Sequence, residues 1–239
     1  MKETVPYNSS ENKKNQIIKM FDNIASTYDV LNHILSLRMD FVWRKTAIRR
    51  ITNNPKKILD IATGTGDLAI CAAKYTKAKI TGVDISENML AIGRIKIDKK
   101  NLTKRITFNI GDAEKLTFKN NSFNVITAGF GVRNFENIDQ GLLEMYRVLD
   151  KNGILIILEP SKPSNFPIKQ IYSIYFSYIL PLLGRIISKD KNAYTYFIKS
   201  VSSFPSQKEF LDKLKTIGFK NCKHTSLTFG VVSLYSATK

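Results

Sequence analysis

Cysteine is almost absent from this chain of 239 residues, which contains only Cys71 and Cys222. Two cysteines cannot form a disulfide framework or a cysteine-based zinc cluster, and they favour a reducing compartment. Proline and glycine are sparse as well, with 7 and 12 residues, whereas hydrophobic residues make up 43% of the chain. This composition excludes collagen-like, mucin-like and disordered proteins, and it is sufficient for a full-sized hydrophobic core.

Long apolar runs are missing too. No stretch reaches the roughly 18 residues that a membrane-spanning helix needs. Residues 1–10 also lack the hydrophobic core of a signal peptide. We therefore expect a soluble, cytoplasmic protein.

Acidic residues are outnumbered by basic ones: 20 Asp and Glu stand against 37 Lys and Arg, a formal net charge of +17. Such an excess raises the question of an anionic partner, either RNA or a phospholipid surface. Most of the basic residues are lysines, which have AT-rich codons. They are scattered in pairs such as Lys56-Lys57 and Lys99-Lys100 rather than gathered in one block. We favour mutational drift on a soluble surface, with an anionic partner as the alternative.

The chain alternates between strand-like and helix-like segments from residue 57 onwards. Expected strands cover 57–61, 79–83, 106–110, 123–128 and 153–158, followed by a hairpin near 220–225 and 230–237. Expected helices cover 67–75, 87–97, 138–149 and 207–216. This order predicts a doubly wound α/β fold, with a mostly parallel seven-stranded sheet that ends in an antiparallel C-terminal strand.

The rest of the chain divides around this alternation. We expect residues 1–15 to be a flexible tail and residues 16–239 to form a single domain, with an N-terminal helical cap at 16–55. Residues 161–205 are too long for an ordinary connection and are rich in Ile, Leu and Tyr. They form either a helix packed on the core or an apolar insertion over a pocket for a hydrophobic ligand.

A glycine-rich turn follows the first expected strand. Asp60 ends that strand, and Gly64, Thr65 and Gly66 lead into a helix. Glycines at this position let the backbone approach a ligand closely, and open α/β sheets bind ligands at the carboxyl ends of their strands. Ala69 stands where a dinucleotide fingerprint has its third glycine. A pair of glycines alone is often only a turn.

Two further acidic residues follow the next strands. Asp84 is placed to accept hydrogen bonds from a ribose, and Asp112, next to Ala113, is placed to accept one from an adenine amino group. Asp84 alone could be a helix cap, since Ser86 and Glu87 follow it. The three features in register indicate an adenosine-binding edge without a phosphate loop, so S-adenosylmethionine is the expected cofactor. We assign Gly129, after the fourth strand, to the same edge.

Three further stretches resemble the C-methyltransferases of ubiquinone and menaquinone biosynthesis, the UbiE/MenG group of class I, Rossmann-like methyltransferases. They are Phe21-Asp22-Asn23-Ile24-Ala25 with Tyr28-Asp29-Val30-Leu31-Asn32-His33-Ile34-Leu35-Ser36 and Trp43-Arg44; Phe130-Gly131-Val132-Arg133-Asn134; and Met145-Tyr146-Arg147-Val148-Leu149 with Gly153 and Glu159-Pro160-Ser161-Lys162-Pro163. The resemblance runs from about Lys19 to the C-terminus. It departs from the usual pattern at Leu31, at Asp40, where histidine is usual, and at residues 150–152.

The resemblance implies methyl transfer from S-adenosylmethionine to a ring carbon of a prenylated quinol, above all demethylmenaquinol. Methylation of the benzoquinol of ubiquinone biosynthesis, or of another lipid-like molecule, is the alternative. The resemblance points to Arg133 and Asn134 as catalytic residues, then to Tyr28 and Asn32, followed by His33. A purely structural role is the alternative for two of them: Arg133 could form a salt bridge, and Tyr28 could pack in the core.

We expect no metal site, because the carboxylates are spread over separate strands. The insertion at 161–205 would shelter the prenyl tail and allow peripheral contact with the inner face of the membrane, which becomes the favoured anionic partner over nucleic acid. An RNA-modifying enzyme is a rival interpretation, as is a catalytically silent cofactor-binding protein. A homodimer is compatible with the sequence, which leaves the oligomeric state open.

Overall fold

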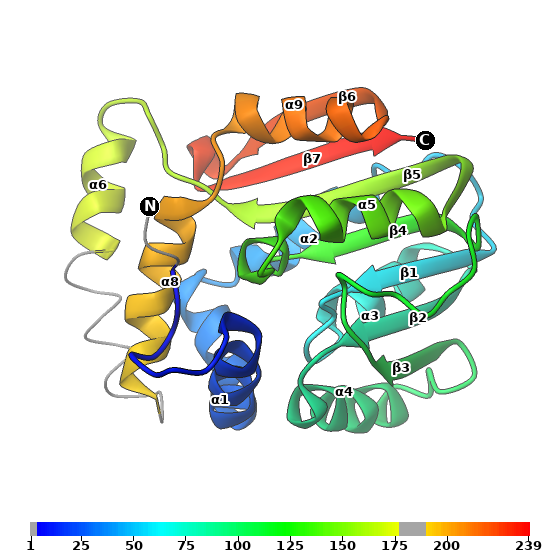
Figure 1. The fold of residues 1–239 in the computed structure, drawn as a ribbon, viewed down its shortest axis with the longest axis horizontal. Coiled ribbons are helices and arrows are strands. Elements are labelled where there is room, and N and C mark those ends of the chain that lie inside the picture. The colour runs from blue at the N-terminus through cyan, green and yellow to red at the C-terminus, as the bar shows by residue number, and fades with distance from the viewer. Residues whose placement is uncertain (1–3, 177–189) are drawn as a thin grey trace.

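The computed structural model describes residues 4–176 and 190–239 of the chain. Its helices and strands alternate as the hydrophobic pattern predicts (Figure 1). The strands are β1 (Lys57–Ile61), β2 (Lys79–Asp84), β3 (Ile106–Ile110), β4 (Phe123–Gly129), β5 (Leu149–Pro160), β6 (Lys220–Leu227) and β7 (Val232–Thr238). The helices are α1 (Lys13–Leu35), α2 (Met39–Ile48), α3 (Asp67–Tyr75), α4 (Glu87–Lys99), α5 (Ile138–Val148), α6 (Ile168–Ile174), α8 (Lys191–Ser203) and α9 (Gln207–Ile217), with 3-10 turns η1 (Val132–Asn134) and η3 (Thr228–Gly230).

The seven strands form one sheet in the order β3-β2-β1-β4-β5-β7-β6. All pairs from β3 to β5 are parallel, whereas β7 runs antiparallel to both β5 and β6. The predicted fold class is therefore confirmed. The antiparallel strand is last in sequence but lies between β5 and β6, so the edge strand β6 again runs parallel to β5.

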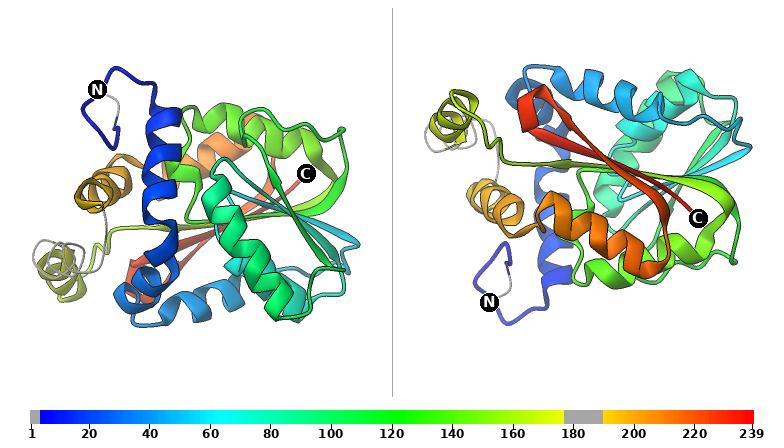
Figure 2. Two further views of the ribbon diagram at one scale, coloured as in Figure 1. Left: turned by 90° about the horizontal axis from the view of Figure 1, so that it is seen from below. Right: turned by 90° about the horizontal axis from the view of Figure 1, so that it is seen from above.

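Alternate residues along the central strands point to opposite faces of the sheet and pack in two separate hydrophobic cores. On β5, Leu155 and Ile157 pack with α5 and α9, whereas Ile154 and Ile156 pack with α2, α3 and α4. Because both faces of the central strands are buried, their sequences read as continuous apolar runs. Figure 2 shows the helices on the two sides of the sheet. This double cover leaves the carboxyl edge of the parallel strands as the open side of the sheet.

Strand β5 is longer than expected and begins at Leu149 rather than residue 153. Leu149 pairs with Phe123, and a register shift separates this pair from Val125, which pairs with Ile154. Asn152, within the stretch 150–152 that departs from the family pattern, has a left-handed φ of 61° and is exposed. The segment therefore both turns and pairs, which the local sequence does not reveal.

In the N-terminal cap, α1 lies at the carboxyl ends of the parallel strands (Figure 1), whereas α2 packs on one face of the sheet. The expected boundary of the tail is corrected: α1 begins at Lys13, and the Asn12 side chain caps it by accepting from the backbone N–H of Asn15. Residues before the helix are also held, since the Tyr7 backbone N–H donates to Gln16 at 2.9 Å and its hydroxyl to Asp190. Their partners are distant in the sequence, so the local hydrophobic pattern does not predict these contacts.

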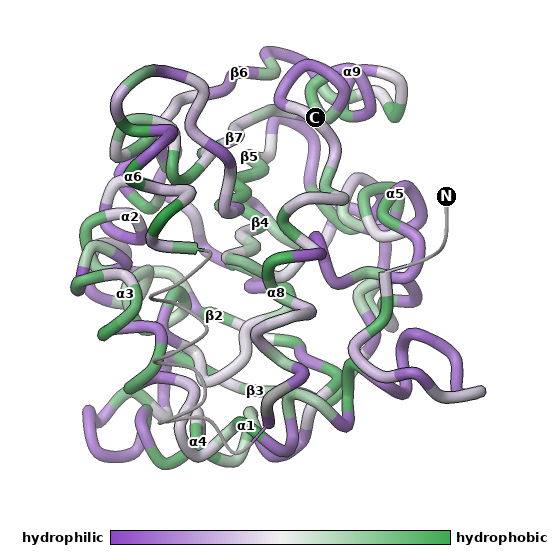
Figure 3. Tube along the Cα trace, turned by 90° about the vertical axis from the view of Figure 1, so that its left-hand side faces the viewer, coloured by the Kyte–Doolittle hydropathy of each residue, from purple (hydrophilic) through white to green (hydrophobic). Residues whose placement is uncertain are grey.

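The insertion at 161–205 contributes α6 and α8 on the same side as the cap (Figure 3). Ala193 and Tyr196 of α8 pack against Ile17, Met20 and Ile24 of α1 as a third apolar cluster. The apolar residues expected between 177 and 189 lie outside the described residues. Among the residues that are described, no helix is both long and apolar enough to cross a membrane.

Candidate active site

The glycine-rich turn between β1 and α3 has left-handed backbone conformations at Gly64 (φ 55°) and Gly66 (φ 83°). A Cβ on Gly66 would lie 2.3 Å from Cζ of Phe108, so both the backbone angle and the packing require glycine there. Gly64 faces the other way and lines a pocket at the sheet edge. The turn thus places Gly64 in the wall of a pocket and packs Gly66 tightly against Phe108.

Asp60 supports this turn from inside the sheet. Its carboxylate is 1% exposed and accepts from the hydroxyls of Thr63 at 2.5 Å and Thr127 at 2.6 Å. Burial raises the pKa of Asp60 to about 6, although both hydrogen bonds lower it. Asp60 does not line the pocket, and the Thr65 hydroxyl points to Asp29 of α1, 2.6 Å away.

The second acidic residue, Asp84, joins two turns. Its carboxylate accepts from the backbone N–H groups of Gly64 at 2.8 Å and Ser86 at 2.9 Å. Ser86 in turn caps α4 by accepting from the N–H of Met89. Burial raises the pKa of Asp84, and these backbone hydrogen bonds oppose the rise. Asp84 therefore organises the loop and also lines the pocket.

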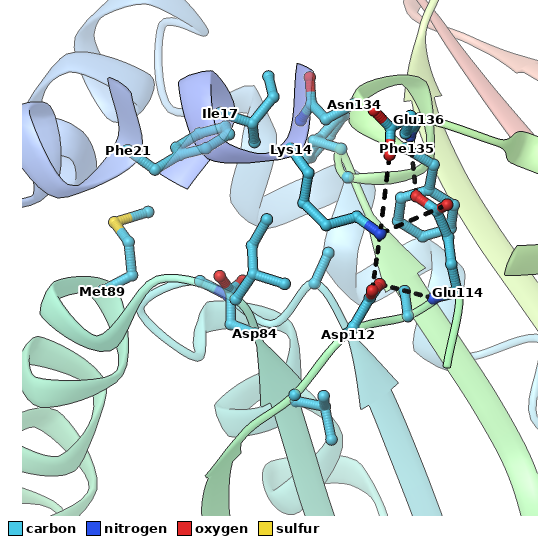
Figure 4. A pocket seen from close by; sticks show the side chains of 18 of the residues that line it. Lys14, Ile17, Phe21, Asp84, Met89, Asp112, Glu114, Asn134, Phe135 and Glu136 are labelled. Atoms are coloured by element: carbon cyan, nitrogen blue, oxygen red, sulfur yellow. Dashed lines mark hydrogen bonds and ion pairs between the residues drawn. The ribbon is translucent and has the colours of Figure 1, made fainter. Parts of the chain in front are cut away.

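Asp112, Ala113 and Gly129 line the same pocket as Gly64 and Asp84. Lys14 of α1 reaches into it, with Nζ 2.7 Å from Asp112 and 3.6 Å from Glu114 (Figure 4). Burial alone would lower the pKa of Lys14, but these carboxylates raise it above the usual value. Glycine backbone and successive strand-end carboxylates suit a nucleoside whose sugar and base donate hydrogen bonds.

A larger cavity of about 430 Å³ adjoins this pocket beneath α1, α2, α6 and α8. Its walls are mostly apolar, with Met20, Leu31, Trp43, Ile168 and Phe197 among them. The two hollows share a group of side chains at their junction, which are Phe21, Tyr28, Phe130 and Asn134. A pocket with several carboxylates and an almost wholly apolar cavity therefore meet at residues that the sequence singled out.

Arg133, on η1, lines the apolar cavity and is 7% exposed at its side chain. Its Nη1 lies 3.1 Å from the fully buried Glu159 and also donates to the carbonyl oxygen of Phe130. The guanidinium carbon stands 5.2 Å from the centre of the Phe197 ring. Within the described part of the chain, its Nε is buried without a hydrogen-bond partner. The expected salt bridge exists, yet one donor is left over in the cavity wall.

The other three predicted catalytic residues converge on this region. Asn134 accepts a 3.2 Å hydrogen bond from the Tyr196 hydroxyl through Oδ1. Burial raises the pKa of Tyr28, whereas the charge of Arg133 and a hydrogen bond with Asn32 lower it. Asn32 lines the apolar cavity. The structure thus places Tyr28, Asn32, Arg133 and Asn134 around one space.

Comparison with known proteins identifies the family. The ubiE/COQ5 methyltransferase family matches residues 9–239. The chain belongs to this family. A demethylmenaquinone methyltransferase of Bacteroides fragilis is 44% identical over 98% of this chain and 96% of its own. A ubiquinone/menaquinone biosynthesis C-methyltransferase UbiE of Geotalea daltonii is 41% identical over 95% of this chain and 97% of its own.

Solved structures show that the ubiE/COQ5 chain has the fold of other methyltransferases. Phosphoethanolamine N-methyltransferase 2 of Haemonchus contortus, in complex with S-adenosyl-L-methionine, superposes with a TM-score of 0.62 at 16% identity. The match covers 83% of this chain and 52% of that chain. At this identity the likeness supports the fold alone, because one fold hosts many reactions.

The unusual Asp40 of this ubiE/COQ5 chain lies in a buried ionic cluster. It contacts Nδ1 of His33 at 2.7 Å and Nη1 of Arg44, whose Nη2 lies 3.4 Å from Asp67. Burial would raise the pKa of Asp40, but the Arg44 charge lowers it below the usual value. Among the described residues, His33, Asp40 and Asp67 are the one group with metal-ligand atoms within 4.8 Å, and Arg44 already supplies positive charge to both carboxylates.

Sequence reasoning missed several residues of the site. Lys14 stood in the expected tail, and Lys96 of α4 carried no motif. Tyr172 of α6 lines the apolar cavity with a hydroxyl that is buried without a partner among the described residues. The high tyrosine content of the insertion at 161–205 was the one sequence feature that could have pointed to Tyr172.

Proposed function

We propose that this protein methylates a ring carbon of a prenylated quinol with S-adenosylmethionine as donor, converting demethylmenaquinol to menaquinol. The observation that carries the proposal is the junction of a pocket lined by strand-end carboxylates and glycines with an apolar cavity of about 430 Å³. The names of the relatives support the same substrate. A lipid-like substrate needs an apolar cavity with few polar groups, and this cavity has that character.

The residues present fit the methyl donor. Gly64 offers backbone close to the ligand, Asp84 would hold the ribose, and Asp112 with Ala113 would hold the adenine. When bound, S-adenosylmethionine supplies an electrophilic methyl group. The conformation of the glycine-rich turn would be maintained by three residues that do not line the pocket themselves, namely Asp60, Thr65 and Gly66. We assign Gly129 a contact with the donor at the floor of the pocket.

Arg133 would stabilise negative charge on the quinol oxygen. A ring carbon next to a hydroxyl becomes nucleophilic as that hydroxyl loses its proton, and a fixed cation lowers the cost of the resulting charge. The pairing with Glu159 fixes the guanidinium, and its Nε–H, which is buried without a partner among the described residues, would donate to the quinol oxygen. A guanidinium is too weak a base to take the proton itself, so it orients the oxygen or a water.

Positioning is the second contribution of the site. Tyr28 and Asn134 stand at the junction of the two hollows, where a ring carbon and a methyl donor would meet. Holding two reactants in line replaces a bimolecular encounter and lowers the barrier. Asn32 lies further into the cavity and would limit how the quinol ring is oriented.

The test is to incubate the purified protein with S-adenosylmethionine and reduced demethylmenaquinone, or the corresponding benzoquinol, and to detect the gain of one methyl group by mass. We expect Arg133→Ala to lose turnover and to keep cofactor binding. Arg94→Gln is the matched control, because Arg94 is a half-exposed arginine of α4 that lines neither hollow. Methylation of the benzoquinol alone would transfer the assignment to ubiquinone biosynthesis, and methylation of neither would refute it.

We further propose that the protein contacts the membrane that holds its substrate. Large apolar side chains are exposed on or next to α2, α6 and η3, three elements that contribute residues to the cavity; they are Leu37 (80%), Phe41 (44%), Phe166 (81%), Ile171 (61%), Ile174 (57%) and Phe229 (78%). Leu37 and Ile171 also line the cavity. A net charge of +17 favours an anionic lipid surface. The substrate tail would then pass from the bilayer into the cavity.

A further inference from the structure

Helix α1 crosses the carboxyl edge of the sheet and contacts each of the three turns that line the cofactor pocket (Figure 2). Lys14 contacts Asp112 after β3, and Asp22 accepts a 2.5 Å hydrogen bond from Ser86 after β2. Asp29 accepts from Thr65 after β1. These contacts follow the order of the strands, β3-β2-β1. Asp22 and Asp29 are seven residues apart, which places them on one face of the helix.

The last of these contacts is reinforced by charge. Lys96 of α4 places its Nζ 2.7 Å from Asp29 and 3.1 Å from the Thr65 hydroxyl, and it also contacts Asp67. We call Asp29, Thr65, Asp67 and Lys96 the Asp29 cluster. The charged side chains of the cluster are only 18–25% exposed. Solvent therefore screens them less than an ordinary surface pair.

The cluster joins three elements that would surround the cofactor. Asp29 belongs to α1, Thr65 and Asp67 belong to the turn and the start of α3, and Lys96 belongs to α4. Tyr28, the neighbour of Asp29, lines both hollows. Because neighbouring helical residues are 100° apart around the axis, fixing Asp29 fixes the rotation of α1 and hence the direction of Tyr28.

We propose that Asp29 and Lys96 are positioning residues that hold α1 over the adenosyl pocket and keep the glycine-rich turn in its binding shape. The inference rests on the proposed function only in taking an S-adenosyl compound as the ligand. Neither residue lines the pocket itself. They act through Thr65, which anchors the turn, and through the backbone of α1.

The test measures binding of S-adenosylhomocysteine to Asp29→Asn, to Lys96→Met and to the double variant, by calorimetry and by stopped-flow dissociation. Each single variant should weaken binding about tenfold, the scale of one hydrogen bond to a charged group. Most of the loss should be faster dissociation. The double variant should lose clearly less affinity than the sum of the two single losses, since both changes remove the contact between Asp29 and Lys96. Lys96→Arg should restore much of the affinity.

The control is the exposed pair of α4, tested with Glu87→Gln and Arg94→Met, whose side chains are 58% and 44% exposed. It should leave binding unchanged. Melting temperatures of the ligand-free variants separate positioning from simple loss of stability. Additive losses in the double variant, or binding losses no larger than those of the control pair, would overturn the inference. If Lys96→Met does not fold, Asp29→Asn with Lys96→Arg carries the same comparison.

No quinol enters this experiment, so the two proposals fail separately. Unchanged binding in the variants refutes the positioning role whatever the wild-type protein methylates. Binding of S-adenosylhomocysteine with no methylation of any quinol refutes the proposed function and leaves the role of the cluster decided by the variants.

Discussion

Side chains at the carboxyl edge of the sheet divide into those that face a ligand pocket and those that hold the backbone behind it. Gly64, Asp84 and Asp112 line the pocket, whereas Asp60 is enclosed by two hydroxyls and Thr65 is bound to Asp29. A carboxylate of the second kind has no access to solvent. Its protonation therefore affects the stability of the fold more directly than ligand binding.

Asp60→Asn should remove a pH dependence of stability. The pKa of Asp60 in the folded protein is about 6, above its ordinary value of 3.8, so the folded state keeps the proton up to a higher pH than the unfolded state does. The free energy of unfolding of the wild-type protein should fall by roughly 3 kcal/mol as the pH rises from about 4 to about 6, and it should then level off. The variant should lack this fall.

Urea unfolding at a series of pH values checks this expectation. The difference between the wild-type and Asp60→Asn free energies of unfolding isolates this carboxyl from the other titrating groups. Parallel curves for the two proteins would show that Asp60 has the same pKa in both states.

Tyr172→Phe should raise the KM for the quinol roughly fivefold, the effect of one lost hydrogen bond, and leave S-adenosylhomocysteine binding unchanged. Burial raises the pKa of this hydroxyl, and within the described residues it has no partner. A buried hydroxyl without a partner costs stability, so the same variant should melt at a higher temperature. Steady-state kinetics and thermal melts measure both effects. Tyr75→Phe, on a half-exposed tyrosine outside both hollows, is the control, and an unchanged KM would show that the hydroxyl does not contact the substrate.

Elements outside the central sheet build most of the apolar cavity. Helices α1, α2, α6 and α8 supply its walls, and the hydroxyl of Tyr175 donates to the carbonyl oxygen of Leu35 at 2.7 Å, which ties the insertion to the end of α1. Apolar side chains on α6 point both into the cavity and out to solvent, as Ile171 and Ile174 show. Such an element suits an interface between a cavity and a lipid surface.

Leu37→Asp with Ile174→Asp should reduce sedimentation with phosphatidylglycerol vesicles about tenfold or more, because two large apolar contacts are replaced by like charges facing an anionic surface. The same double change should affect turnover on long-chain quinols in vesicles more than turnover on a short-chain analogue in solution. Ile95→Asp is the control, since Ile95 is 55% exposed on α4. Equal losses for the control would assign vesicle binding to net charge alone.

At the scale of the whole molecule, the net charge of +17 has no single location in the sequence. Several basic residues serve internal contacts, as Lys14, Arg44, Lys96 and Arg133 do by pairing with carboxylates. The basic residues are scattered along the chain, and most of them are lysines. A dispersed positive field attracts any anionic surface without selecting a sequence or a shape.

Vesicle binding by the wild-type protein should therefore depend steeply on the fraction of anionic lipid and weaken as salt rises toward 0.5 M, roughly as expected from screening. RNA should compete with vesicles only at low salt. Sedimentation across a salt series, with and without RNA, measures this. RNA that displaces the protein at physiological salt would revive nucleic acid as the partner.

Much of the fold follows from local patterns. Strands 57–61 and 106–110 are predicted at their observed bounds, because buried parallel strands leave short apolar runs that end in polar or glycine-rich turns. The positions of Asp84 and Asp112 beside one pocket could be predicted from the sequence, because the ends of neighbouring strands meet at one edge of a parallel sheet. The start of α1 could not be predicted in this way. Lys13 donates to the carbonyl oxygen of Phe135 and Lys14 to Asp112, which are 122 and 98 residues away along the chain.

The division between the two sources of information is physical. Periodicity of apolar residues and glycines at turns act over a few residues, so the chain alone specifies the order of its elements, the edge where a nucleoside can bind and the family motifs. Three features depend on contacts between distant segments: which carboxylate faces the pocket, which nitrogen of Arg133 has no partner among the described residues, and which lysine ties α1 to the glycine-rich turn. Only packing in three dimensions decides those, because burial and pairing are properties of neighbours in space.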